Sequence, residues 1–179
     1  MPKKTVKKSS NRSQLRPVGA RALKSALDTL RPFLAGVKVL DLYAGQGRFA
    51  YGALLEGAQH AVLVEHDAVT ARELRSLRSK KIPSDRISQI LCQDVWRFLE
   101  QPSGDLYDVI FVDPPFEEFT SELATRLFLA LKDFAHPGTI LLVKTPSRML
   151  LSTGDSAFKL WKITQFGEAQ LAYFTYGQK

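Results

Sequence analysis

The chain has 179 residues and an ordinary hydrophobic fraction of 45%, which predicts one globular domain with a proper core. No apolar run approaches the roughly 18 residues needed to cross a bilayer, and the basic N-terminus lacks the apolar segment of a secretory signal. A single cysteine, Cys92, excludes an internal disulfide, and three scattered histidines indicate no metal site. We therefore expect a cytoplasmic monomer without a metal or a membrane contact.

The net charge of +7 is unevenly placed along the chain. Residues 1–24 hold eight lysines and arginines and no acid, which leaves 17 basic and 18 acidic residues for the remainder. Such a segment is typical of an arm that binds a nucleic-acid backbone, and a disordered solubilising tail has the same composition. We expect a flexible basic arm over residues 1–14 and a single domain over 15–179.

Beyond the arm, the hydrophobic pattern predicts helices that alternate with strands. Helices are expected over 19–31, 49–56, 67–80, 96–99 and 117–132, and strands over 37–42, 60–65, 86–92, 107–112 and 139–144. The sequence His-Pro-Gly at 136–138 is expected to end the last of these helices. Two extended runs, 157–166 and 169–176, meet at Gly167 and predict a hairpin. The alternation indicates an α/β fold with a mostly parallel seven-stranded sheet and a C-terminal antiparallel hairpin, in which the apolar strand 107–112 is central.

A Gly-rich turn follows the first strand. Residues 45–47 read Gly-Gln-Gly and lead into a helix, so this segment matches the first half of a nucleotide-binding βαβ unit. Gly45 and Gly47 allow a left-handed backbone and let a ligand approach without a Cβ in the way. Gly-x-Gly alone is a weak signal, because an ordinary strand-to-helix turn has the same pattern.

Four acids lie at the carboxyl ends of predicted parallel strands. They are Asp41, Glu65, Asp94 and Asp113, and ligands of open α/β sheets bind at this carboxyl edge. Glu65 lies about 20 residues beyond the glycines, where an acid is expected to bind a pair of ribose hydroxyls. Asp94 is expected to accept from an adenine amino group or to face solvent. Any one of these acids alone could instead be a helix N-cap or a loop acid.

The sequence Asp113-Pro114-Pro115-Phe116 follows the central strand, at the same edge as the Gly-rich turn. The two prolines fix the backbone and remove N–H groups that would compete for the carbonyls. The Asp113 carboxylate and the Pro114 carbonyl could each accept an N–H from a planar base amino group and turn its lone pair toward an electrophile. Phe116 could stack on the base. The alternative is a proline-rich loop with Phe116 in the core.

These motifs resemble those of class I S-adenosylmethionine-dependent methyltransferases, which have a Rossmann-like fold. Within that superfamily the chain is similar to the RsmD type, which methylates the N2 amino group of a guanine in small-subunit (16S) ribosomal RNA. The resemblance extends over about residues 15–176. The resemblance rests on Leu15-Arg16-Pro17, residues 39–47, Val64-Glu65, Asp94, residues 108–116 and Phe166-Gly167.

The resemblance implies roles for individual residues. Asp113, Pro114, Pro115 and Phe116 would be catalytic, with direct transfer of the methyl group and no covalent enzyme intermediate. S-adenosylmethionine would be bound by Asp41, Tyr43, Ala44, Gly45, Gly47, Glu65, His66, Asp94 and Val95. Ribosomal RNA or the small-subunit particle would be contacted through phosphates by Arg12, Arg16, Arg21 and Arg48.

Other functions stay open on the residues alone. The Asp-Pro-Pro-Phe motif does not separate guanine N2 from adenine N6 or cytosine N4, so a DNA adenine methyltransferase is one alternative. An NAD-dependent oxidoreductase also uses a Gly-rich turn and an acid, although Ala50 stands where a third glycine is usual and no catalytic Tyr-Lys or His arrangement can be placed. The third alternative is a non-catalytic RNA-binding protein that has the same scaffold.

Overall fold

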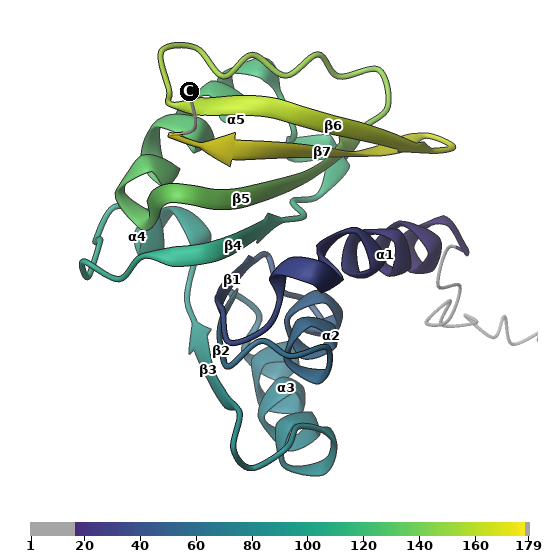
Figure 1. The fold of residues 1–179 in the computed structure, drawn as a ribbon, viewed down its shortest axis with the longest axis vertical. Helices are drawn as coiled ribbons and strands as arrows, with labels where there is room; N and C mark the ends of the chain where they lie inside the picture. The colour runs from purple at the N-terminus through teal and green to yellow at the C-terminus, as the bar shows by residue number, and fades with distance from the viewer. Residues whose placement is uncertain (1–16, 178–179) are drawn as a thin grey trace, which may run out of the picture.

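A seven-stranded sheet in the order β3-β2-β1-β4-β5-β7-β6 runs through the protein (Figure 1). The computed structural model describes residues 17–177. Strands β1 to β5 are parallel, whereas β7 pairs antiparallel with both β5 and β6. This arrangement confirms the predicted α/β class, the hairpin and the central place of β4. The strands are β1 Lys38–Leu42, β2 His60–Glu65, β3 Ile87–Cys92, β4 Tyr107–Val112, β5 Ala135–Pro146, β6 Phe158–Phe166 and β7 Ala169–Tyr176.

Helices cover both faces of the sheet. Helices α1, α2 and α3 pack on one face, and α4 and α5 pack on the other. None of the helices within residues 17–177 is both long and apolar enough to cross a membrane. The helices are α1 Pro17–Leu30, α2 Arg48–Leu55, α3 Ala68–Lys81, α4 Val95–Leu99 and α5 Ser121–Leu131, with the 3-10 turns η1 Arg31–Phe33, η2 Phe116–Glu118 and η3 Lys132–Phe134.

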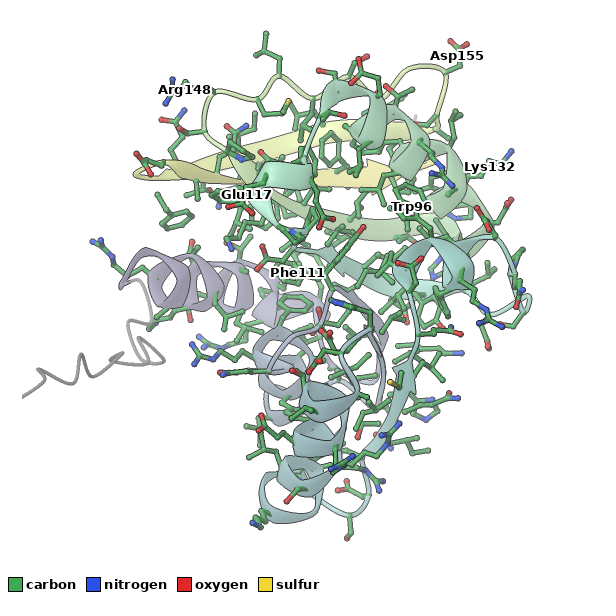
Figure 2. All side chains as sticks on the ribbon, turned by 180° about the vertical axis from the view of Figure 1, so that it is seen from behind. Trp96, Phe111, Glu117, Lys132, Arg148 and Asp155 are labelled. Atoms are coloured by element: carbon green, nitrogen blue, oxygen red, sulfur yellow. The ribbon has the colours of Figure 1, made fainter. Side chains whose placement is uncertain are left out.

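Side chains of the parallel strands alternate between two hydrophobic cores. In β1, Val39 packs with α1 and α2, whereas Leu40 packs with α4 and α5. Phe111 of β4 stacks on Phe49 of α2 with ring centroids 4.2 Å apart, in the middle of the molecule (Figure 2). Because β1, β2 and β4 are buried on both faces, they read as nearly continuous apolar runs, whereas the edge strand β3 is only partly buried.

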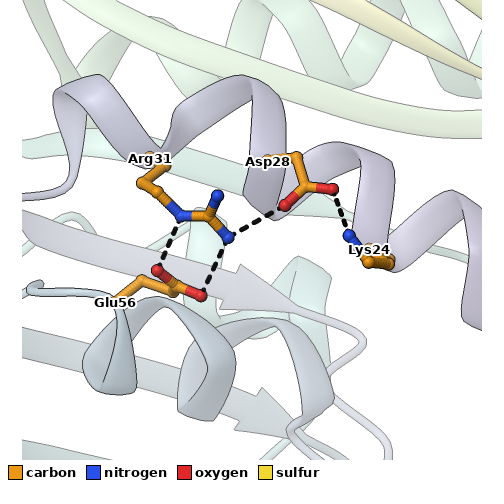
Figure 3. Close-up of polar contacts among 4 residues, drawn as sticks. All are labelled: Lys24, Asp28, Arg31 and Glu56. Carbon is orange, nitrogen blue, oxygen red and sulfur yellow. Dashed lines mark hydrogen bonds and ion pairs between the residues drawn. The ribbon is translucent and has the colours of Figure 1, made fainter.

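Helix α1 is attached to α2 by burial and by ion pairs. Its inner face, with Ala26 and Leu30, is fully buried. Arg31, just after the helix, donates to both carboxylate oxygens of Glu56 at 2.9 and 3.2 Å and to Asp28 at 2.9 Å (Figure 3). Arg31 holds the pKa of Glu56 below its usual value. Exposed pairs of this kind add little to stability, so the buried face anchors α1 and the ion pairs fix its register.

Two predicted boundaries are wrong. The helix expected over 117–132 is interrupted, because Thr120 accepts the N–H of Leu123 at 3.1 Å and starts a new helix at Ser121. Residues 136–138 do not end a helix but lie within β5. There the Thr139 hydroxyl accepts the N–H of His136 at 2.9 Å and donates to the Tyr107 carbonyl at 2.6 Å, across an irregularity in the β4–β5 register. Side-chain hydrogen bonds thus overrode the local pattern at both places.

Gly47 precedes α2 with φ +64°, and a Cβ at this position would lie 2.6 Å from Leu74 Cδ2 and 2.8 Å from Leu63 Cδ2. Gly47→Ala therefore combines a left-handed backbone cost with overpacking of the core, and should lower the free energy of unfolding by about 2–4 kcal/mol. Gly36→Ala is the matched control, because Gly36 has φ +76° and open space around it. It should lose only about 1–2 kcal/mol in urea unfolding. Equal losses in the two variants would contradict the close packing at Gly47.

Candidate active site

Two adjoining cavities open where the carboxyl ends of β1, β2, β4 and β5 meet. The glycine-turn cavity has about 230 Å³ and is lined by the Gly-rich turn, the start of α2, part of α1 and the end of β4. The proline cavity has about 390 Å³ and is lined by Glu65, His66, residues 113–117 and two residues from the neighbouring strands. Tyr43, Asp113 and Lys144 line both cavities. The site residues predicted from β1, β2 and β4 are therefore brought together in space.

Asp41 caps helix α2 from the neighbouring strand. Its Oδ2 accepts the N–H of Ala50 at 3.1 Å, in the first turn of the helix. This N–H needs an acceptor, because Gly47 at the N-cap has no side chain. Burial raises the pKa of Asp41 well above its usual range, and the carboxylates of Asp113 and Glu65 add to the rise. Asp41 therefore shapes the turn and places a poorly solvated acid against the cavity.

Glu65 joins the end of β2 to the Gly-rich turn. Its Oε2 accepts the N–H of Gly45 and its Oε1 accepts the N–H of Asp67, both at 2.8 Å. His66 Nδ1 lies 3.2 Å from Oε1, and its own side chain is exposed. A carboxylate can accept about four hydrogen bonds, so Glu65 keeps acceptor capacity toward the proline cavity. Glu65 can therefore hold the turn and accept hydrogen bonds from a ligand at the same time.

Tyr43 adopts an unusual backbone conformation between β1 and the glycines. Its φ of +60° is the only positive value among the non-glycine residues that the structure describes. Such a conformation costs about 1–3 kcal/mol and persists where the surroundings enforce it. Burial raises the pKa of Tyr43 to about 12, with contributions from Glu118 and Asp94. The phenol is therefore neutral and stands between the two cavities. Ala44, next in the chain, donates its N–H to the Val64 carbonyl at 3.0 Å.

Asp113 is paired with a lysine that the sequence did not single out. Lys144 Nζ lies 2.8 Å from Oδ1 and 2.9 Å from Oδ2 of Asp113. Burial raises the pKa of Asp113, and the Lys144 charge opposes the rise. Lys144 follows Val143, which is level with Val112 across the β4–β5 pair. A lysine near the end of the strand next to β4 is expected to lie beside Asp113. The sequence alone does not show that β5 is this neighbouring strand, so Lys144 could be found only once the strand order was known.

The prolines and Phe116 differ in burial. Pro114 is buried, Pro115 is exposed and Phe116 is partly buried on the wall of the proline cavity. The buried phenylalanine of this segment is Phe119, which is 5% exposed. The alternative that places Phe116 in the core therefore does not describe this structure. Its ring is accessible from the cavity, and Lys144 Nζ lies 5.3 Å from the ring centroid.

Asp94 and Val95 line neither of these two cavities. Asp94 is the N-cap of α4, where its Oδ1 accepts from Trp96 at 2.8 Å and from Arg97 at 3.1 Å. Val95 is 3% exposed and belongs to a hydrophobic core. The helix-cap alternative thus accounts for the geometry of Asp94, and the cofactor contacts expected of both residues stay predictions.

The arginines predicted to contact RNA are spread out. Arg21 is exposed on α1, and Arg48 is exposed at the start of α2 on the rim of the glycine-turn cavity. Gln46 Oε1 accepts from Arg48 Nε at 3.1 Å and from Nη2 at 2.8 Å, which directs the guanidinium. Arg12, Arg16 and the whole predicted arm over residues 1–14 lie outside the described residues. RNA contacts of all four stay predictions.

Comparisons with known proteins agree with this fold. A relative from Haemophilus influenzae named Ribosomal RNA small subunit methyltransferase D is 30% identical over 148 residues, covering 82% of this chain and 76% of the relative. The structure of a "putative methylase" from Haemophilus influenzae has a TM-score of 0.75 and 26% identity over 90% of this chain and 100% of the other. Magnesium protoporphyrin IX methyltransferase from Synechocystis, solved with bound SAM, shares the fold at a TM-score of 0.72 and 17% identity, over 92% of this chain and 86% of the other.

A family model matches nearly the whole length. It is described as Conserved hypothetical protein 95 and covers residues 3–175. The match includes every element that contributes to the two cavities, from α1 to β7. The chain therefore belongs to the Conserved hypothetical protein 95 family, the RsmD type of class I methyltransferase that its motifs indicate.

Proposed function

We propose that the protein transfers a methyl group from S-adenosylmethionine to the N2 amino group of a guanine in small-subunit (16S) ribosomal RNA. One observation carries the proposal: the Asp113 carboxylate stands where two cavities adjoin, with the accessible Phe116 ring beside it. Together the two cavities offer space for a cofactor and a base, and the acceptor lies between them. The family relationship and the name of the Haemophilus influenzae relative support ribosomal RNA as the substrate.

The residues present suit the cofactor. When bound, S-adenosylmethionine supplies a methyl group activated by a positively charged sulfur. Burial raises the pKa of Asp41, and the nearby carboxylates of Asp113 and Glu65 raise it further, so the site favours a cation. A Cβ built on Gly45 would meet only the Tyr43 carbonyl, at 3.9 Å, so the backbone there is open to a ligand. Glu65 would accept from ribose hydroxyls, and the turn would hold the rest of the cofactor.

Asp113 and the two prolines do the positioning. The carboxylate and the Pro114 carbonyl accept the two N–H groups of the base amino group, which points its lone pair at the methyl carbon. The cofactor would supply the methyl carbon for the new bond to nitrogen and would leave as S-adenosylhomocysteine, and Asp113 or water would accept the proton that the amino nitrogen gives up. Phe116 stacks on the base. Positioning of this kind supplies most of the rate, because the reactants are held in line.

Basic residues bring the RNA to the site. Arg48, Arg21, Arg16 and Arg12, the last in the N-terminal arm, contact phosphates and give affinity without sequence readout. The target base leaves its stack before it reaches Phe116, which costs a few kcal/mol and favours loops over duplex. We propose that the protein acts as a monomer in the cytoplasm, on free RNA or on the small-subunit particle.

The test of the function is transfer of labelled methyl from S-adenosylmethionine to ribosomal RNA, small-subunit particles and duplex DNA in parallel. Digestion and mass spectrometry identify the modified nucleoside. N2-methylguanosine from RNA or particles is expected. Methyladenine from DNA would overturn the substrate and keep the chemistry, whereas cofactor binding without transfer to any of the three would favour the non-catalytic alternative.

Asp113→Asn should lower kcat by about 10²–10⁴-fold, because an amide that replaces the carboxylate is a weaker acceptor for the amino N–H groups. Binding of S-adenosylhomocysteine, measured by calorimetry, should persist. Asp133→Asn is the control, since Asp133 is exposed beyond α5 and outside both cavities. Wild-type turnover in Asp113→Asn would remove Asp113 from the mechanism.

Glu65→Gln should weaken S-adenosylhomocysteine binding roughly tenfold, since one of the two backbone N–H groups then faces a donor instead of an acceptor. Calorimetry measures this directly and needs no RNA. Glu73→Gln, on the exposed face of α3, serves as the matched control. Equal affinities in the two variants would show that Glu65 does not organise the cofactor site.

A further inference from the structure

Lys144 is the part of the site that the proposed mechanism leaves unused. It lies near the end of β5, directly beside the end of β4, because Val143 and Val112 are level in the parallel register. Its ammonium contacts both carboxylate oxygens of Asp113, at 2.8 and 2.9 Å. The side chains of Lys144 and Asp113 are 21% and 32% exposed, so the pair is partly screened from water.

Charged groups from several elements face Asp113. Asp41 comes from β1, Glu65 from β2 and Glu117 from η2, and each lines one of the two cavities that Asp113 also lines. His66, just after β2, lines the proline cavity and Arg48 of α2 lines the glycine-turn cavity, but Arg48 donates to Gln46. Within residues 17–177, Lys144 is the one cation within 4 Å of the Asp113 carboxylate. The charge of Asp113 therefore depends on Lys144 more than on any other side chain described.

The same ammonium lies over the Phe116 ring, 5.3 Å from its centroid. A cation at this distance from a ring face is attracted by it, so Lys144 links the acceptor and the aromatic wall of the proline cavity. The three groups come from β5, the end of β4 and η2. Their relative placement is fixed by one side chain that reaches both of the others.

We propose that Lys144 is the positioning residue for Asp113: it keeps the carboxylate ionised and fixes its plane beside Phe116, ready to accept N–H from a base amino group. This inference rests on the proposed function. Two hydrogen bonds to Lys144 use about half of the acceptor capacity of the carboxylate, so the remainder is available to the substrate. Lys144 does not touch the reacting atoms and acts through Asp113.

The physical reason is the cost of a buried charge. Burial raises the pKa of Asp113, and Lys144 is the group that opposes the rise. Without the ammonium, the neutral acid is favoured over a wider pH range, and a protonated carboxyl group presents an O–H where the amino group needs an acceptor. The active form should therefore be lost as pH falls through a pKa that is higher in the variant than in the wild type.

The experiment compares Lys144→Met, Lys144→Gln and Lys144→Arg with the wild type, using small-subunit particles and labelled S-adenosylmethionine. Lys132→Met is the matched control, because Lys132 is exposed at the far end of α5 from Glu117 (Figure 2). The pH dependence of kcat and of kcat/KM is measured for each protein. In parallel, ¹³C NMR follows the titration of the Asp113 carboxyl carbon, assigned with Asp113→Asn.

We expect the acidic limb of the kcat profile to lie about one to three pH units higher in the two neutral variants than in the wild type. At pH values below this limb, kcat should be at least tenfold lower than in the wild type. At alkaline pH, kcat should recover. The Asp113 titration should move by the same amount. Lys144→Arg should restore most of the profile, and S-adenosylhomocysteine binding should change little. A purely structural role would lower activity equally at every pH.

Two results would overturn the inference: an unchanged Asp113 titration in the folded Met and Gln variants, or a loss of kcat that does not depend on pH. Circular dichroism establishes that each variant is folded. If the wild type transfers no methyl group to any substrate, the proposed function fails. The NMR titration then still decides whether Lys144 controls the charge of Asp113.

Discussion

Two buried carboxylates hold the turn between β1 and α2, and the whole site is built on this turn. Asp41 accepts the N–H of Ala50, and Glu65 accepts the N–H of Gly45. The turn is thereby tied both to the helix that it starts and to the neighbouring strand. The parallel register makes this possible, because Leu42 is level with Val64 on one side and with Val112 on the other. Acids that follow these strands must then meet at one edge of the sheet.

The same convergence creates the electrostatic character of the site. Burial raises the pKa of both Asp41 and Asp113, and at Asp41 the neighbouring carboxylates of Asp113 and Glu65 add to the rise. Lys144 opposes the rise in pKa at Asp113, whereas within residues 17–177 Asp41 has no such cation acting on it. A cationic ligand in the glycine-turn cavity would offset it further, which links the structural role of the acids to the cofactor that we propose. Stability and binding therefore depend on the same carboxylates.

Much of the architecture could be predicted, because the strands are short apolar runs bounded by Gly, Pro and acids. The hairpin at Gly167 and the central place of β4 followed from such patterns. The interrupted helix before Ser121 and the continuation of β5 through His136 could not, since each depends on one hydroxyl hydrogen bond. Among the site residues, Lys144 was missed because it is 31 residues from Asp113 and ends an apolar strand without a recognisable motif.

The sequence by itself determined the chemical groups of the site. The Gly-rich turn, the acids after the strands and Asp113-Pro114-Pro115-Phe116 are local features, and local backbone geometry fixes what they can do. Only the tertiary structure decided which groups act on one another. It pairs Lys144 with Asp113, makes Asp94 the N-cap of α4, and leaves Phe116 partly accessible while burying Phe119. These outcomes depend on strand order and on exclusion of water, which arise when distant segments pack together.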